Sequence, residues 1–110
     1  ITTRIQMKRI LEGAGYEVVT AVDGLDAYNK LIARPFDAVV SDILMPNMDG
    51  LTLTEKIRQD KKHKELPIIL VTSLSSEDDK RRGGGAGANA YITKPAFDQK
   101  MFLDTLKRLI

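Results

Sequence analysis

The sequence contains no cysteine, and none of its apolar runs is longer than a few residues. Without cysteine the chain cannot hold a disulfide framework, a thiolate metal site or a cysteine nucleophile. A membrane-spanning helix needs roughly 18 or more consecutive apolar residues, and no segment of this sequence approaches that length. Residues 1–8 also lack the apolar core of a signal peptide. We therefore expect a soluble, cytoplasmic domain with no membrane partner.

An excess of charge of one sign is missing as well. The 110 residues include 17 Lys and Arg and 15 Asp and Glu, so the formal net charge is only +2. This balance does not indicate direct binding to nucleic acid, which is typical of chains with a concentrated basic surface. With 43% hydrophobic and 29% charged residues, the composition is that of a folded globular protein. The length predicts one domain over residues 1–110.

Segments with helical and with strand periodicity alternate along the chain. We predict helices at residues 1–14, 25–33, 51–58 and 98–110, with a further helix whose first turn contains Glu77 and Asp78. We predict strands at residues 17–21, 37–43, 67–72 and 90–93. This alternation favours a parallel α/β sheet with helices on both faces. Because a helix at the start of such a fold normally follows a strand, one strand is expected to be missing ahead of the first helix.

Three consecutive glycines, Gly83, Gly84 and Gly85, fall within the predicted fourth helix. Each is about 1 kcal/mol less favourable than alanine inside a helix. We therefore predict that this helix is short or frayed.

Three polar residues follow or end consecutive predicted strands: Asp42, Thr72 and Lys94. In an open α/β sheet, ligands bind beyond the carboxyl ends of the strands. A carboxylate, a hydroxyl and an ammonium group at one place suit a phosphoryl group, with the carboxylate as nucleophile and the other two groups contacting the transferred oxygens. A single strand-end aspartate would more simply cap a loop, so the hypothesis depends on all three residues together.

Three segments of the sequence carry a resemblance to a known family. Residues 41–50 (SDILMPNMDG), 67–73 (PIILVTS) and 86–95 (AGANAYITKP) resemble the three signature blocks of response-regulator receiver domains. The resemblance extends over nearly the whole chain. It implies a flavodoxin-like, doubly wound parallel sheet of strand order 2-1-3-4-5, with strand 1 absent from this chain.

The resemblance implies that Asp42 accepts a phosphoryl group from a histidine kinase in two-component signal transduction. Thr72 would move to bond that group, Lys94 would pair with it, and Tyr91 would swing inward behind Thr72, which changes the surface offered to a downstream protein or output domain. The domain would thus be a phosphoacceptor and not an enzyme. The peptide bond between Lys94 and Pro95 is usually cis in the family, at low cost for a proline.

The resemblance also implies a Mg²⁺ ion, held in part by Asp42 and the backbone carbonyl of Leu44. The remaining acidic ligands of the family lie at the end of strand 1, and this chain does not contain them. We hypothesise that the natural protein has this strand and that only the complete domain holds the ion. Gly84 and Gly85 are a second departure, because the family more often has an apolar and a polar helix residue there.

Two alternative functions are weighed beside the first. A degenerate receiver would act as a phosphorylation-independent interaction module; the missing acidic pair favours this, and the presence of Asp42, Thr72 and Lys94 opposes it. A flavodoxin-like enzyme or nucleotide binder would need a glycine-rich loop after its first strand. Residues 83–87 are glycine-rich but precede a strand, which is the wrong context.

The C-terminal segment that starts at Phe97, Asp98 and Gln99 is similar to receivers fused to the C-terminus of chemotaxis-type histidine kinases. The phosphodonor would then lie in the same polypeptide, whereas otherwise it acts in trans. Oligomerisation through the face formed by the fourth and fifth helices is left open. Because neither Leu44 nor Leu74 can orient a hydrolytic water, we predict slow loss of the phosphoryl group.

Other residues have simpler interpretations. Asp49 and Gly50 are interpreted as turn and helix-cap residues without a catalytic role. Tyr91 in a strand is on its own most simply a half-buried packing residue. His63, in a basic loop, is predicted to be a solvated surface residue.

Overall fold

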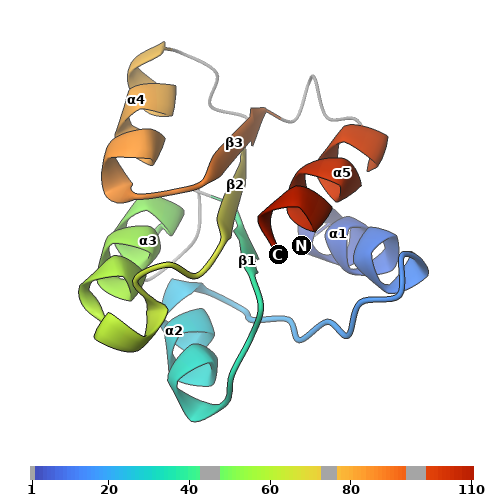
Figure 1. Cartoon of the computed structure of the whole chain (residues 1–110), viewed down its shortest axis with the longest axis horizontal. Coiled ribbons are helices and arrows are strands. Elements are labelled where there is room, and N and C mark those ends of the chain that lie inside the picture. Colours follow the sequence, from blue (N-terminus) through green and yellow to red (C-terminus); the bar gives the residue numbers. More distant parts are fainter. Residues whose placement is uncertain (1, 43–47, 73–76, 94–98) are drawn as a thin grey trace.

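The computed structural model of the chain describes residues 2–42, 48–72, 77–93 and 99–110 (Figure 1). In chain order its elements are α1 (Thr2–Gly13), α2 (Gly24–Ala33), β1 (Val39–Ser41), α3 (Gly50–Gln59), the short 3₁₀ helix η1 (Lys61–His63), β2 (Ile68–Thr72), α4 (Glu77–Ala86), β3 (Ala90–Thr93) and α5 (Gln99–Leu109). No helix in these ranges is long and apolar enough to span a membrane.

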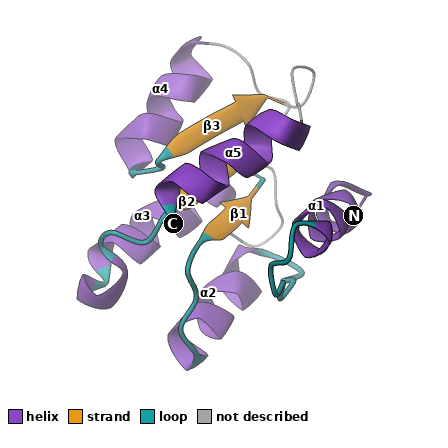
Figure 2. Cartoon of the chain, turned by 45° about the vertical axis from the view of Figure 1, so that its right-hand side comes forward, coloured by secondary structure: helices purple, strands orange, loops and turns teal. Residues whose placement is uncertain are grey.

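The described part of the sheet has three parallel strands in the order β1-β2-β3. Val39 of β1 lies opposite Ile68 of β2, and Ile69 of β2 lies opposite Ala90 of β3. Helices α1 and α5 cover one face of the sheet, and α2, α3 and α4 cover the other (Figures 1 and 2). The predicted α/β class with helices on both faces of a parallel sheet is confirmed.

The side chains of β2 alternate between two hydrophobic cores. Ile69 and Val71 pack with α1 and α5, where Phe102 is fully buried, whereas Ile68 and Leu70 pack with α2 and α3. All four β2 side chains are at most 1% exposed. Full burial of such a side chain contributes about 1.5–3 kcal/mol, which explains why this strand is an uninterrupted apolar run.

Aspartates cap two of the helices that lead away from the sheet. The Asp23 carboxylate accepts a hydrogen bond of 2.8 Å from the backbone N–H of Asp26 at the start of α2. The Asp49 carboxylate accepts one of 2.7 Å from the N–H of Thr52 at the start of α3. Such caps contribute about 1 kcal/mol each, and the prediction that Asp49 is a cap residue is confirmed.

The predicted strand at residues 17–21 does not form. These residues connect α1 to α2 without joining the sheet, because a strand is stable only beside a hydrogen-bonding neighbour and no such neighbour lies beside them among the described residues. The connection is held to α2 instead. Lys30 Nζ donates a hydrogen bond of 2.7 Å to the carbonyl oxygen of Thr20, and the N–H of Val22 donates one of 3.0 Å to Asp26 Oδ2.

The fourth helix was predicted to be short or frayed, and the prediction that it is short was wrong, since α4 continues through all three glycines and is ten residues long, as are α2 and α3. That its end frays stays a prediction. A Schellman motif ends this helix. The N–H of Ala88 donates to the carbonyl oxygen of Gly83 at 3.2 Å, and the N–H of Gly87 donates to that of Gly84 at 3.1 Å. Gly87 has a φ of 109°, the left-handed conformation that this cap requires.

The prediction for His63 was also wrong, because its side chain is only 14% exposed. Its Nδ1 atom lies 3.3 Å from Oδ2 of Asp60, the residue that caps η1. The backbone N–H of Lys62 and the His63 side chain lower the pKa of Asp60 below its usual value. The loop is therefore folded back on its own cap residue, which sequence position alone did not indicate.

Candidate functional site

The carboxyl edge of the sheet brings together two of the predicted site residues. Asp42 directly follows β1, and because Ser41 lies opposite Leu70, Asp42 is level with Val71 of β2. Thr72 ends β2 one residue further along, opposite Thr93 of β3. The backbone positions of Asp42 and Thr72 are therefore neighbours at one end of two adjacent strands.

Several predicted site residues lie outside the described residues: Leu44, Leu74, Lys94 and Pro95. The predicted cis bond between Lys94 and Pro95 is among these untested features, as is the Leu44 carbonyl ligand. Lys94 follows in sequence directly after Thr93, the last residue of β3.

The end of β1 holds Asp42 at the boundary between the core and solvent. Ser41 is buried, and its hydroxyl donates a hydrogen bond of 2.8 Å to the backbone carbonyl oxygen of Asp42. The Asp42 side chain is half-buried. Asp42 therefore directly follows the last residue of β1 and keeps part of its surface exposed.

Gly24 is a residue near this site that the sequence analysis missed. A Cβ atom at Gly24 would collide with the backbone carbonyl oxygen of Met48. The start of α2 thus packs closely on the chain where it returns from the Asp42 loop, and Asp49 then begins α3. A glycine directly after a helix-capping aspartate is the only sequence signal for this contact.

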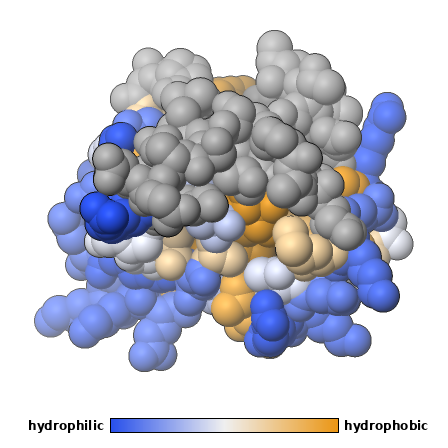
Figure 3. Space-filling model, turned by 90° about the horizontal axis from the view of Figure 1, so that it is seen from above, coloured by the Kyte–Doolittle hydropathy of each residue, from blue (hydrophilic) through white to orange (hydrophobic). Residues whose placement is uncertain are grey.

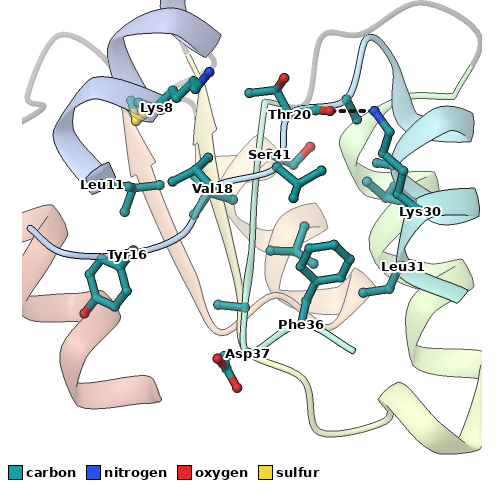
Figure 4. A pocket seen from close by; sticks show the side chains of 18 of the residues that line it. Lys8, Leu11, Tyr16, Val18, Thr20, Lys30, Leu31, Phe36, Asp37 and Ser41 are labelled. Atoms are coloured by element: carbon teal, nitrogen blue, oxygen red, sulfur yellow. Dashed lines mark hydrogen bonds between the residues drawn. The ribbon is translucent and has the colours of Figure 1, made fainter. Parts of the chain in front are cut away.

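A groove of about 740 Å³ lies between residues 16–23 and β1. It extends from Leu106 and Ile110 of the C-terminal region to Asp42. In Figure 4, side chains of α1, of the connection from Tyr16 to Thr20, of α2 and of β1 surround this space. Figure 3, which looks down on the molecule from above, shows apolar surface exposed between hydrophilic borders.

The backbone of β1 adds hydrogen-bonding groups to this groove. The N–H of Val39 donates a bond of 2.9 Å to the carbonyl oxygen of Pro67, on the β2 side. Alternate residues of a strand bond to opposite sides, so the N–H and C=O of Val40 are directed away from β2. Val40 lines the groove, which thus offers both apolar side chains and a strand edge.

The described residues do not form a metal site on their own. Among residues 2–42, 48–72, 77–93 and 99–110, no three or more His, Asp or Glu side chains lie close enough to hold an ion. Asp23 also lines the groove, but its carboxylate caps α2. A Mg²⁺ ion needs several oxygen ligands, and Asp42 supplies a single carboxylate.

Two curated proteins match most of this sequence. The DNA-binding dual master transcriptional regulator RpaA of Synechocystis is 34% identical over 100 residues, which cover 91% of this chain and 41% of RpaA. The sensor protein EvgS of Escherichia coli is 36% identical over 106 residues, which cover 96% of this chain and 8% of EvgS. The chain thus spans less than half of either relative.

Solved structures show the same fold. The chemotaxis response regulator CheY4 of Vibrio cholerae superposes with a TM-score of 0.90 at 35% identity, covering 100% of this chain and 91% of CheY4. The receiver domain of sensor histidine kinase PA1611 from Pseudomonas aeruginosa, with a magnesium ion in its active-site cleft, has a TM-score of 0.89 at 28% identity, covering 98% of this chain and 87% of that domain. The sequence matches the response regulator receiver domain family over residues 2–107. The chain therefore belongs to the response regulator receiver domains, the phosphoacceptor signalling domains of two-component systems.

Proposed function

We propose that Asp42 is the residue that accepts the phosphoryl group, and that the chain acts as a switch without catalytic turnover. The observation that carries this proposal is the position of Asp42, half-buried at the carboxyl end of β1 and beside the end of β2. A carboxylate oxygen would attack the phosphorus of a phosphohistidine. The N–P bond then breaks as the acyl phosphate forms, and the histidine leaves with a proton from solvent.

Thr72 and Lys94 would contact the oxygens of the transferred phosphoryl group, which spreads negative charge over them. Thr72 ends the strand next to Asp42, which supports its part in this role. Tyr91 would report the change to the surface, because its ring lies on the α4 side of the sheet. For Lys94 the support is its place in the sequence directly after β3.

The phosphodonor would be a histidine kinase, either a separate protein or part of the same polypeptide, as in the sensor histidine kinase PA1611, which contains its own receiver domain. The output would be a downstream protein or domain, without direct contact of this domain with nucleic acid. Pairing of copies through the face of α4, β3 and α5 stays a prediction.

We further propose that the groove beside β1 receives one more parallel strand and that this strand supplies the acidic ligands for Mg²⁺. The apolar lining and the outward-directed backbone of Val40 suit a strand buried on both faces. Asp42 lines the groove at the carboxyl end of β1, so the carboxyl end of such a strand would place its side chains beside that carboxylate. The magnesium ion in the PA1611 receiver supports the same metal here.

Phosphorylation by acetyl phosphate in the presence of Mg²⁺, followed by intact-protein mass spectrometry, tests both proposals. It is measured on this chain and on a chain with about fifteen additional residues ahead of residue 1, enough for a strand and its turn. We expect the longer chain to gain the mass of one phosphoryl group and its Asp42→Asn variant to gain none. Asp37→Asn is the matched control, because Asp37 is an exposed aspartate before the other end of β1.

Phosphorylation that persists in the Asp42→Asn variant would exclude Asp42 as the acceptor. If neither chain is phosphorylated, the phosphorylation-independent interaction module is the better function. That second function is favoured by the single carboxylate at the described site. If both chains respond equally, the added strand is not needed for the ion.

A further inference from the structure

Helix α2 has apolar side chains on both its core side and its solvent side. Leu31 is buried in the core, and Ala27 and Tyr28 pack against the same cluster. On the solvent side, the large apolar side chains of Leu25 and Ile32 are 47% and 55% exposed. A helix at the surface of a globular protein normally carries polar residues on its outer side, so α2 departs from this pattern.

The exposed residues Leu25, Asn29 and Ile32 form an outer stripe on α2, because residues four and then three positions apart lie on the same face of a helix. Helix α3 has the same length and provides a comparison. Its exposed residues at the same spacing are all polar: Thr52, Lys56 and Gln59. Exposed apolar side chains that share one helix face mark a candidate contact surface.

The strand proposed for the groove beside β1 would leave the outer stripe uncovered. Ala27 and Leu31 line that groove, whereas the three residues of the outer stripe are not among the described residues that line it. In Figures 1 and 2, α2 lies at an outer edge of the fold, and no other described element lies beyond it. A partner of the outer stripe therefore comes from outside the described residues.

The charges of α2 favour a second copy of the chain as this partner. Asp26 lies in the first turn of α2 and Lys30 in its last turn. These two side chains pair with each other at 3.1 Å, but they remain 31% and 41% exposed. Two antiparallel copies of α2 would place the acidic start of each helix beside the basic end of the other, and the helix dipoles would also attract.

The spacing of the outer stripe is self-complementary as well. In an antiparallel pair with a two-fold axis, Leu25 would lie opposite Ile32 of the second copy, and the reverse contact would form at the other end. Asn29 lies between these two positions, so the two Asn29 amides would meet near the axis. A polar residue at the centre of a helix pair fixes the register of the two helices.

We propose that α2 forms the interface of a homodimer, in which the outer stripes of two copies pack antiparallel. Because a helix of ten residues is only about 15 Å long, the buried area falls below the roughly 1,000 Å² of a stable interface. The dimer is therefore weak, with a dissociation constant of about 0.1–1 mM. The pairing requires no phosphoryl group, so it goes beyond the proposed function and is tested separately from it.

Sedimentation velocity of the unphosphorylated full chain, at concentrations that bracket this range, tests the proposal. The weight-average sedimentation coefficient rises with concentration toward the value of a dimer. Leu25→Lys and Ile32→Glu each raise the dissociation constant by about tenfold or more, because a symmetric dimer receives each charge twice. Thr52→Lys and Gln59→Glu on α3 are the matched controls, since they introduce the same charges at the same spacing and leave the association unchanged.

An equimolar mixture of the Leu25→Lys and Ile32→Glu variants tests the antiparallel arrangement. In an antiparallel pair the introduced lysine lies opposite the introduced glutamate, and the other half of the interface keeps its original contact, so the association returns. In a parallel pair the two introduced charges lie at opposite ends, and the association stays weak. Circular dichroism verifies that each variant is folded.

Two results would overturn the homodimer. The chain could stay monomeric at every concentration, or a dimer could form that neither Leu25→Lys nor Ile32→Glu weakens, which would place the interface at the groove or at α4 and α5. Weakening in both variants without recovery in their mixture would overturn the antiparallel arrangement.

Discussion

Arg58 connects more segments of this domain than its place on α3 suggests, and its replacement provides a quantitative test of the fold. Its guanidinium donates to the carbonyl oxygens of Gly87, Leu66 and His63 at 2.9, 2.6 and 3.1 Å and to Asn89 Oδ1 at 2.7 Å. Partial burial lowers the pKa of Arg58 below its usual value. The four bonds connect α3 to η1, to the segment just before β2 and to the turn after α4.

The variant Arg58→Met keeps the aliphatic length of the side chain and removes all four bonds. At about 1 kcal/mol per bond, the loss of four bonds would lower the free energy of unfolding by about 4 kcal/mol. We expect a loss of about 2–3 kcal/mol, because some of the acceptors bind water or keep another donor in the variant. Arg58→Lys keeps the charge and loses the planar arrangement of donors, so we expect it to cost about 1–2 kcal/mol.

The free energy of unfolding is measured by urea denaturation with circular dichroism, at a common slope for all variants. Arg34→Lys is the matched control, because Arg34 pairs at 3.3 Å with Glu17 through side chains that are 53% and 82% exposed. Such an exposed pair contributes less than about 1 kcal/mol. If Arg58→Met were no more destabilising than Arg34→Lys, the Arg58 network would not hold these segments together.

Three further outcomes follow from the structure and from the proposed site. Gly24→Ala lowers the free energy of unfolding by about 1–3 kcal/mol, because its methyl group meets the Met48 carbonyl oxygen; a neutral result in urea denaturation would contradict this contact. A hydrogen bond from the backbone N–H of Val22, and then the Lys30 ammonium, lower the pKa of Asp26 below its usual value, so its carboxyl resonance should titrate below that of a free aspartate. The stabilising effect of this carboxylate is complete above about pH 4 and is lost as the pH falls through the lowered pKa. Leu44→Asn shortens the lifetime of phosphorylated Asp42 severalfold by orienting a water molecule, and an unchanged or longer lifetime in a decay assay would refute the prediction of slow hydrolysis.

The sequence predicted those elements whose pattern is local. The apolar residues of β2, the capping position of Asp49 and the amphipathic α5 each follow from a few neighbouring residues, and the structure confirms them. The same is true of the strand ends that place Asp42 and Thr72 at one edge of the sheet.

The features that sequence reasoning missed depend on partners far along the chain. Residues 17–21 have strand composition, but a strand needs a neighbour, and none lies beside them in the described part of the sheet. Arg58 donates hydrogen bonds to Gly87 and Asn89, which lie 29 and 31 residues away in the sequence. No local sequence pattern predicts these bonds. The lack of space at Gly83 likewise comes from a residue outside its helix, because a Cβ atom there would lie 2.6 Å from Cδ2 of Tyr91.

Because the side chains of β2 alternate between two hydrophobic cores, the two faces of the sheet can change in sequence separately. Ile69 and Val71 support the α1 and α5 side, whereas Ile68 and Leu70 support the side with α2 and α3. Because the sheet separates these two sets of contacts, substitutions that remodel one side leave the packing of the other side in place. The apolar residues on the α2, α3 and α4 side can therefore be exchanged while the packing of α1 and α5 against the sheet stays in place.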